Sequence, residues 1–188
     1  MIEKLSYCIS KYIKNNNEAL DQNDFLKLIY VIQVIFTDTI ILLLLFIFFG
    51  MLGKLFIFSL ALIILVTLRP FMGGIHFNSL VSCTLVTIIH FSLIVFFSDI
   101  FPRYNNYIYV VIFLFSIILV LIYAPLPNKK RRIKNLIKLK IISLISLSFW
   151  ISIFFYIKSL YICNTIFLSI ILQSIQIIII NIEECFYE

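Results

Sequence analysis

The sequence predicts an all-α polytopic membrane protein with about six transmembrane helices and an N-terminal amphipathic helix. Of its 188 residues, 63% are hydrophobic and only 13% are charged, and the mean hydropathy is +1.13. A soluble protein is about half apolar and about a quarter charged, and one of this length could not bury so many apolar side chains. Six apolar stretches and an uneven distribution of positive charge point to the same fold class.

Residues 1–27 are polar and predict a cytoplasmic segment that begins with a short interfacial helix. Five apolar side chains recur there at helical spacing, namely Ile2, Leu5, Ile9, Tyr12 and Ile13. The lysines of this segment fall largely on the other positions. No apolar core of a signal peptide follows the start, so we expect the first hydrophobic span to be a retained helix. A disordered leader with fortuitous spacing is the alternative.

Six stretches are apolar enough to cross the hydrocarbon of a bilayer, which takes about 20 residues and at least about 17. They lie near residues 28–49, 52–68, 79–100, 107–124, 141–157 and 159–180. The second and the fifth are short, and each is compatible with a re-entrant segment as well as with a full span. No repeat or linker is visible, so residues 1–188 are expected to form a single integral membrane domain.

Positive charge distinguishes the two sides of the predicted bundle. If the N-terminus is cytoplasmic, the outer loops hold only Lys54, Arg103 and Lys158 of the 15 lysines and arginines. Lysine and arginine accumulate in the cytoplasmic loops of membrane proteins. The abundance of Ile, Lys, Asn and Phe is typical of an AT-rich bacterial genome. We therefore expect a multi-pass protein of the bacterial cell membrane with both termini in the cytoplasm.

The four cysteines form neither a metal-binding nor a disulfide pattern. Cys8, Cys83, Cys163 and Cys185 include no CxxC pair and have no regular spacing. With two histidines in the chain and no ligand cluster, no metal and no cofactor is expected. Three of the cysteines are most simply small packing residues. Cys83 differs from them because of its neighbours.

His76 and Cys83 form the candidate pair of base and nucleophile. On one continuous helix they would lie about 10.5 Å apart along the axis, at about 1.5 Å per residue, which is too far for contact. Pro70, Gly73 and Gly74 precede them and disfavour a helix through this stretch. The sequence therefore predicts a loop that folds His76 back toward the start of the third span.

The start of that third span suits a reactive thiolate. Asn78 or Ser79 is a good N-cap, which places Cys83 in the second turn of the helix. The helix N-terminus and a protonated His76 would both favour the thiolate, and the histidine can return a proton to a leaving amine. Backbone N–H groups of the glycine loop, or Arg69, are candidate oxyanion donors.

Chance spacing and a non-enzymatic function are the competing interpretations. A small membrane transporter or partner subunit would use Asp38 and His90 as pathway residues and Cys83 for packing. A transporter built from inverted repeats should show matched broken helices in both halves, and only the segment near residues 69–74 is interrupted. This favours the enzyme. His90 shares the helix face of Cys83 two turns deeper, where a hydrogen bond within the bundle is expected.

Two segments of the chain carry a resemblance to a known family. The first contains Arg69-Pro70, Gly73-Gly74-X-His76 and Cys83, and the second is Tyr123-Ala124-Pro125 followed by a lysine-rich stretch. Together they resemble the signature of the AgrB family, the accessory gene regulator B proteins of Gram-positive bacteria. The resemblance covers essentially the whole chain.

The resemblance implies a membrane cysteine endopeptidase that acts on a short quorum-sensing pro-peptide of the AgrD type. The family's catalytic residues map onto Cys83 and His76. Cys83 would attack a carbonyl near the C-terminal part of the substrate and release an acidic tail. The acyl-enzyme thioester would then pass to a substrate cysteine or serine, closing a thiolactone or lactone ring. The resemblance also implies a homodimer, and no nucleic-acid partner is expected.

A basic run follows the second segment and has two interpretations. Lys129, Lys130, Arg131 and Arg132 depart from the family's usual pattern after the proline. Membrane topology and anionic lipid explain most of this charge. The functional interpretation is that the run also attracts the acidic tail of the pro-peptide. Gln33, near the cytoplasmic end of the first span, is a further candidate for substrate contact.

Overall fold

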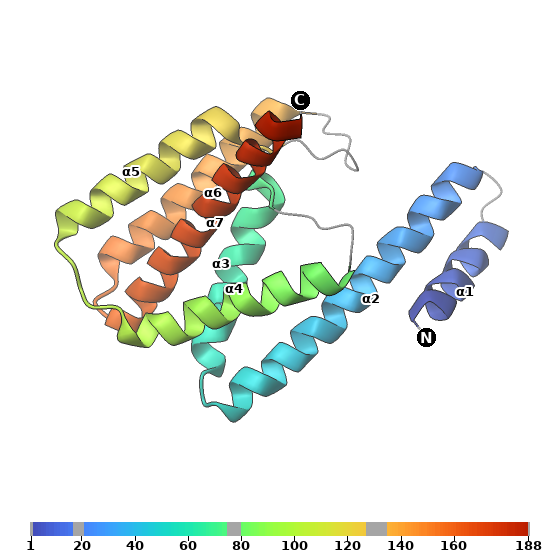
Figure 1. Cartoon of the computed structure of the whole chain (residues 1–188), viewed down its shortest axis with the longest axis horizontal. Coiled ribbons are helices and arrows are strands. Elements are labelled where there is room, and N and C mark those ends of the chain that lie inside the picture. The colour runs from blue at the N-terminus through green and yellow to red at the C-terminus, as the bar shows by residue number, and fades with distance from the viewer. Residues whose placement is uncertain (1, 17–20, 75–79, 127–134, 188) are drawn as a thin grey trace.

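The structure, a computed structural model, describes residues 2–16, 21–74, 80–126 and 135–187, without the side chains of residues 80, 83 and 183–187. Within these residues it contains helices and no strand, which confirms the all-α prediction (Figure 1). The helices are α1 (Ile2–Asn15), α2 (Gln22–Met51), α3 (Leu55–Met72), α4 (Leu80–Ile100), α5 (Asn106–Tyr123), α6 (Leu136–Tyr156) and α7 (Leu160–Tyr187).

Five helices of the described part are long and apolar enough to cross a membrane, namely α2, α3, α5, α6 and α7. In α4 the described apolar stretch is the shorter Thr84–Ile100. Helices α2 to α7 thus correspond in order to the six predicted spans, and the protein is a multi-pass membrane protein. α3 and α6, which were expected to be short, have 18 and 21 residues, so each is long enough for a full span (Figure 1).

Several helices extend beyond the apolar stretches that the sequence predicted. The fifth span was expected to begin near residue 141 and to be short, but α6 has 21 residues and starts at Leu136. Its first turns include Lys138 and Lys140, whose long side chains can reach the headgroup layer while the backbone stays helical. α2 likewise starts at Gln22, in a polar turn that also holds the Lys27–Asp24 ion pair at 2.8 Å.

The predicted break at Pro70 is wrong, because α3 continues through this proline to Met72. Proline lacks an N–H and crowds the carbonyl four residues earlier. In the last turn of a helix this disturbance is local, and the Gly73 N–H still closes the turn on the Arg69 carbonyl at 2.9 Å. The helix ends at Gly73, which has a φ of 93°.

α7 is the central helix and contacts α3, α4, α5 and α6. A larger apolar core forms where α3, α5, α6 and α7 meet, around the aromatic rings of Phe113, Phe154 and Phe167. A second core forms mainly between α2, α3 and α4, where Phe49 stacks on Phe58 with ring centroids 5.0 Å apart. The bundle therefore holds α7 against the ends of both α3 and α4.

α2 joins the bundle through its second half. Its buried residues, Ile41, Leu45 and Phe49, all lie there, while its first half pairs with α1 (Figure 1). α1 turns the small side chains of Ser6 and Ser10 inward and leaves Leu5 and Tyr12 exposed. An exposed apolar face beside a membrane span is what an interfacial helix requires.

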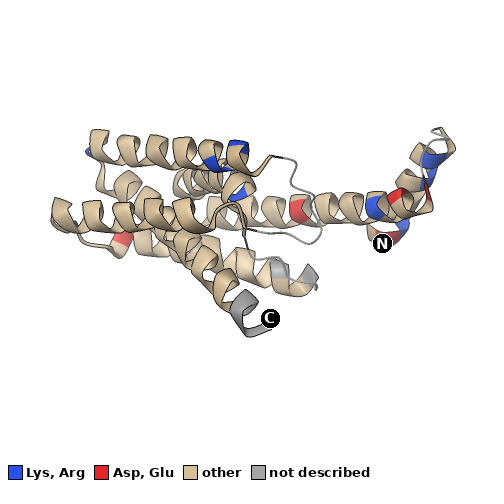
Figure 2. Ribbon diagram, turned by 90° about the horizontal axis from the view of Figure 1, so that it is seen from above, with Lys and Arg blue, Asp and Glu red and all other residues tan. Residues whose placement is uncertain are grey.

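The charged residues gather toward the helix ends, and most of the helix bodies carry none (Figure 2). At the end where α2 turns into α3, the Lys54 ammonium is paired with the carboxylate of Asp99, near the end of α4. The opposite end holds the C-terminus of α3 and the N-termini of α4 and α6. This second end contains the candidate site.

Candidate functional site

Gly73 ends α3 in a conformation that only glycine adopts readily. Its φ and ψ are 93° and 174°, a region from which a side chain is excluded by steric conflict with the backbone. Its N–H is engaged by the Arg69 carbonyl at 2.9 Å. The chain therefore leaves α3 in a fixed direction, and seven residues separate Met72 from Leu80, the first residue of α4.

The segment after α5 packs directly on this helix end. The Leu126 N–H donates to the Met72 carbonyl at 3.1 Å, and a Cβ added to Gly73 would come within 2.7 Å of the Leu126 Cβ. Tyr123-Ala124-Pro125, the second of the two signature segments, leads into Leu126. The structure thus brings the glycine segment and the Tyr-Ala-Pro segment together at one end of the bundle.

Two glutamines of α7 complete this cluster, and the sequence analysis missed both. Gln173 donates from Nε2 to the Gly73 carbonyl at 2.6 Å. Gln176 Nε2 lies 3.2 Å from Nδ1 of His90, and an amide NH₂ can only donate, so Nδ1 accepts. The sequence did contain an indication of them, because Gln173 and Gln176 are two amides three residues apart in an apolar span. Polar side chains in a membrane span are costly and usually have a function.

The hydrogen bond expected for His90 within the bundle is confirmed, and it connects α4 to α7. The exposed fractions of His90, Gln173 and Gln176 are 7%, 2% and 8%. Of the described polar atoms at this end, the Oε1 atoms of both glutamines and Nε2 of His90 lack a hydrogen-bond partner. Unsatisfied polar atoms in a buried setting are unusual and mark a place where function outweighs stability.

Gly74 gives the guanidinium of Arg69 room to reach the same cluster. A Cβ on Gly74 would come within 2.7 Å of Arg69 Nε and 3.3 Å of Gln176 Oε1. Arg69, Gly73 and Gly74 therefore lie together, beside α7.

The remaining predicted site residues are only partly described. Cys83 is the fourth residue of α4, where the first turn passes into the second, close to the predicted place. His76 and the basic residues Lys129, Lys130, Arg131 and Arg132 lie outside the described residues. Gln33 lies in the first half of α2, half-buried, and no hydrogen bond of the described side chains joins it to the cluster. No three potential metal ligands gather among the side chains that the structure describes.

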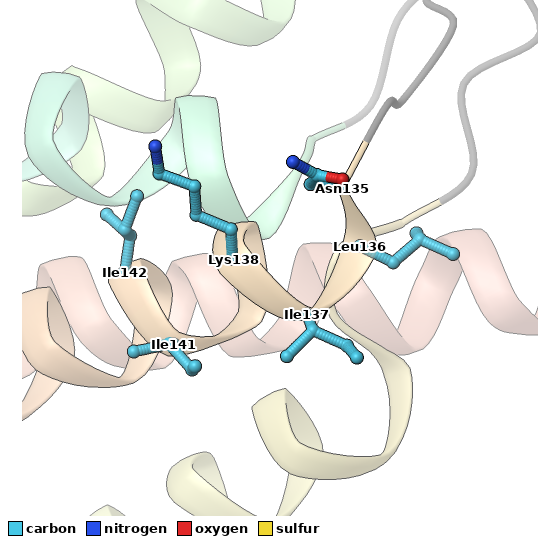
Figure 3. Close-up of a pocket in the computed structure, with 6 residues that line it drawn as sticks. All are labelled: Asn135, Leu136, Ile137, Lys138, Ile141 and Ile142. Carbon is cyan, nitrogen blue, oxygen red and sulfur yellow. The ribbon is translucent and has the colours of Figure 1, made fainter.

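An open groove lies near the cluster, at the start of α6. It has a volume of about 760 Å³ and is lined by Asn135, Leu136, Ile137, Lys138, Ile141 and Ile142. Asn135 and Lys138 project to one side of the helix, and Ile137 and Ile141 to the other (Figure 3). The groove thus combines one cation with apolar surface, which suits an amphipathic segment.

Comparison with known proteins agrees with the two signature segments. The sequence model of accessory gene regulator B matches residues 6–177. A protein of Clostridium beijerinckii described as AgrB-like is 42% identical over 181 residues, which is 96% of this chain and 90% of that protein. No solved structure matches the chain. The chain therefore belongs to the accessory gene regulator B family, and so to the proteins that take part in processing quorum-sensing autoinducers.

Proposed function

We propose that the protein is a membrane cysteine endopeptidase that cleaves a short quorum-sensing pro-peptide and enables its cyclisation. One observation carries the proposal: the Gly73-Gly74 segment is held by α7 and by Leu126, and the chain runs from it directly into α4, whose fourth residue is Cys83. His76 is two residues beyond Gly74, within about 7 Å of chain reach. We propose that the imidazole reaches Cys83 from this position.

The proposed chemistry begins with the Cys83 thiolate. The N-terminal turn of a helix stabilises a negative charge, and a protonated His76 would do so further. The sulfur adds to a peptide carbonyl, and the tetrahedral intermediate collapses when His76 gives its proton to the leaving amine. The resulting thioester keeps the acyl group activated. The neutral His76 then takes the proton of a substrate thiol or hydroxyl, whose sulfur or oxygen displaces Cys83; this closes the thiolactone or lactone ring and regenerates both the Cys83 thiolate and the protonated His76.

The oxyanion is assigned to Gly74 and Arg69. The Gly73 N–H already donates to the Arg69 carbonyl, so its function is to shape the turn. The Gly74 N–H and the Arg69 guanidinium, which lies beside Gly74, are the donors that we assign to it, and a donor placed before the reaction needs no reorganisation during it.

The substrate is proposed to be an AgrD-like peptide with an amphipathic start and an acidic end. Lys138 and the apolar side chains of the α6 groove would contact it, together with Gln33 and the basic run from Lys129 to Arg132. Attraction of an acidic tail by this run is electrostatic and should weaken with salt. We place this end of the bundle, with both termini, in the cytoplasm, where an unprocessed peptide would arrive, and the protein would act as a homodimer in the bilayer.

The decisive experiment is processing of a co-expressed candidate pro-peptide from the reading frame beside the gene. Cys83→Ala and His76→Ala should abolish cleavage, and Cys83→Ser should lower it strongly because a serine has no thiolate. Cys8→Ala is the matched control, since Cys8 is an exposed cysteine on α1, remote from the cluster. Normal cleavage by inserted Cys83→Ala protein would refute the mechanism and leave a transporter or partner subunit as the alternative.

The function of the basic run is tested separately. Arg131→Gln/Arg132→Gln should raise the KM for the pro-peptide and reduce the dependence of KM on salt, with kcat unchanged. Arg103→Gln, which alters a cation at the other end of the bundle, is the control. Unchanged KM values in correctly inserted protein would leave the run with a topological function alone.

A further inference from the structure

We infer that Gln173 is a positioning residue that locks the peptide unit between Gly73 and Gly74 and so aims the Gly74 N–H at the reacting carbonyl. This inference rests on the proposed function. The direct observation is the hydrogen bond from Gln173 Nε2 to the Gly73 carbonyl at 2.6 Å. Because this hydrogen bond is short and comes from a buried side chain, the glutamine helps to determine the direction of the carbonyl.

The direction of the Gly73 carbonyl also determines the direction of the Gly74 N–H. The Gly73 carbonyl and the Gly74 N–H belong to one planar unit, and the described peptide bonds are trans except Ala124–Pro125. In a trans unit the C=O and the N–H point in opposite directions. Because Gln173 holds the carbonyl toward α7, the N–H must point away from α7. Gln173 therefore acts on the proposed oxyanion donor without touching the substrate.

This peptide unit needs a lock because both of its flanking residues are glycines. A peptide flip changes ψ of Gly73 and φ of Gly74, and glycine tolerates the values on both sides of such a flip. The backbone before the unit is fixed by the Gly73 N–H bond to Arg69 and the Met72 carbonyl bond to Leu126. Without Gln173, the Gly73 carbonyl would lose this hydrogen bond, and the flip would become less costly.

Burial makes Gln173 suitable for this purpose. Only 2% of its surface is exposed, so water does not compete for the hydrogen bond and the side chain has little freedom to leave it. The amide belongs to the central helix, whose contacts with α3 and α4 fix its position. A purely structural tie between α7 and α3 would have the same appearance, so the test must separate stability from transition-state positioning.

Asn164 provides the matched control. It is a buried amide of the same helix, and its Nδ2 donates to two backbone carbonyls, those of Ser98 at 2.9 Å and Phe101 at 2.8 Å. It lies at the opposite end of the bundle. Asn164→Leu should therefore cost at least as much stability as Gln173→Leu, but it leaves the Gly73-Gly74 unit untouched.

The experiment uses the full chain in proteoliposomes with the candidate pro-peptide. Gln173→Leu should lower kcat about 10- to 100-fold, with KM changed less than about 3-fold, because a misdirected oxyanion donor affects only the transition state. Asn164→Leu should keep kcat within about 3-fold of wild type per folded molecule. Gln173→Glu retains the shape and donates only when protonated, so its kcat relative to wild type at the same pH should rise as the pH falls.

A second measurement separates failure of this inference from failure of the proposed function. The rate of Cys83 alkylation by iodoacetamide is followed by mass spectrometry, with Cys8 as the internal reference. Gln173→Leu should leave this rate within about 2-fold of wild type, whereas His76→Ala should change its pH profile. Full kcat in Gln173→Leu, or an equal loss in Asn164→Leu, overturns the positioning function of Gln173. Unimpaired cleavage by Cys83→Ala overturns the proposed function itself.

Discussion

Replacement of Gly73 by alanine should be among the most damaging single-methyl additions in this protein. A φ of 93° with a ψ of 174° costs a non-glycine residue about 1–3 kcal/mol. The new Cβ would also lie 2.7 Å from the Leu126 Cβ, and overpacking of this kind costs about 1–3 kcal/mol. The entropy that alanine removes from the unfolded chain returns about 0.4–1 kcal/mol. We therefore expect Gly73→Ala to lower the free energy of unfolding by about 1–5 kcal/mol.

Gly53 is the matched control for the backbone part of this cost. It also has a positive φ, of 68°, but a Cβ at this position would meet no atom within 4 Å. Gly53→Ala should therefore cost only the backbone strain of about 1–2 kcal/mol, less the same entropy gain. The measurement is the unfolding midpoint and slope of both variants in mixed micelles titrated with a denaturing detergent. Equal losses in the two variants would refute the contact with Leu126 as a source of energy.

A second substitution tests which atom of Leu126 is responsible. Leu126→Ala keeps the Cβ at 2.7 Å and removes the rest of the side chain, including the Cγ and Cδ1 that a Gly73 Cβ would meet at 3.4 and 3.3 Å. Leu126→Gly removes the Cβ as well. In a double-mutant cycle with Gly73→Ala, we expect a favourable coupling of about 1–2 kcal/mol for Leu126→Gly and a smaller one for Leu126→Ala. Rescue by Leu126→Ala alone would show that the backbone of this segment moves apart instead.

Two further predictions concern hydrogen bonds between spans. Thr67→Val should destabilise the protein by about 1 kcal/mol, because Trp150 Nε1 loses the acceptor that lies 2.8 Å away. Thr39→Val, which affects a bond within one helix, should be nearly neutral in the same unfolding assay. At the end of the bundle where α2 turns into α3, Asp99→Leu should leave the half-buried Lys54 without its partner and cost about 1 kcal/mol of stability. The double variant with Lys54→Met should be more stable than the sum of the two single losses predicts, and strict additivity would show that the pair contributes nothing.

The order and number of the helices could be predicted from the sequence because hydrophobicity alone determines them. A segment that crosses lipid must satisfy its backbone internally, so each long apolar stretch becomes a helix. The predicted helix boundaries are less accurate than the predicted spans, because hydrophobicity does not determine where a helix begins or ends. α6 begins before its apolar part, at Leu136, and α3 passes through Pro70 because the next residues still close a helical turn.

Only the parts of the candidate site that are close together in sequence could be predicted. The spacing of His76 and Cys83 and the glycine pair indicated a turn, but the partners of that turn are distant in sequence. Gln173 is 100 residues from Gly73 and Gln176 is 86 from His90. Such contacts follow from the packing of α7, which no local pattern specifies. The Tyr-Ala-Pro segment was recognised by resemblance, and the structure adds that Leu126 after it packs on the glycine turn.

The two buried amides of α7 also explain why this helix, among all of them, can control the site. The end of a helix leaves backbone carbonyls unpaired, and within a membrane no water is available to satisfy them. Asn164 meets this need at the end of α4, where Ser98 and Phe101 accept its bonds. Gln173 meets it one residue beyond α3, at Gly73. The first amide stabilises a helix that has already formed, but the second fixes a peptide unit that glycine leaves free to turn. In our proposal the same interaction is therefore structural at one end of α7 and, at the other, a means of setting the geometry of catalysis.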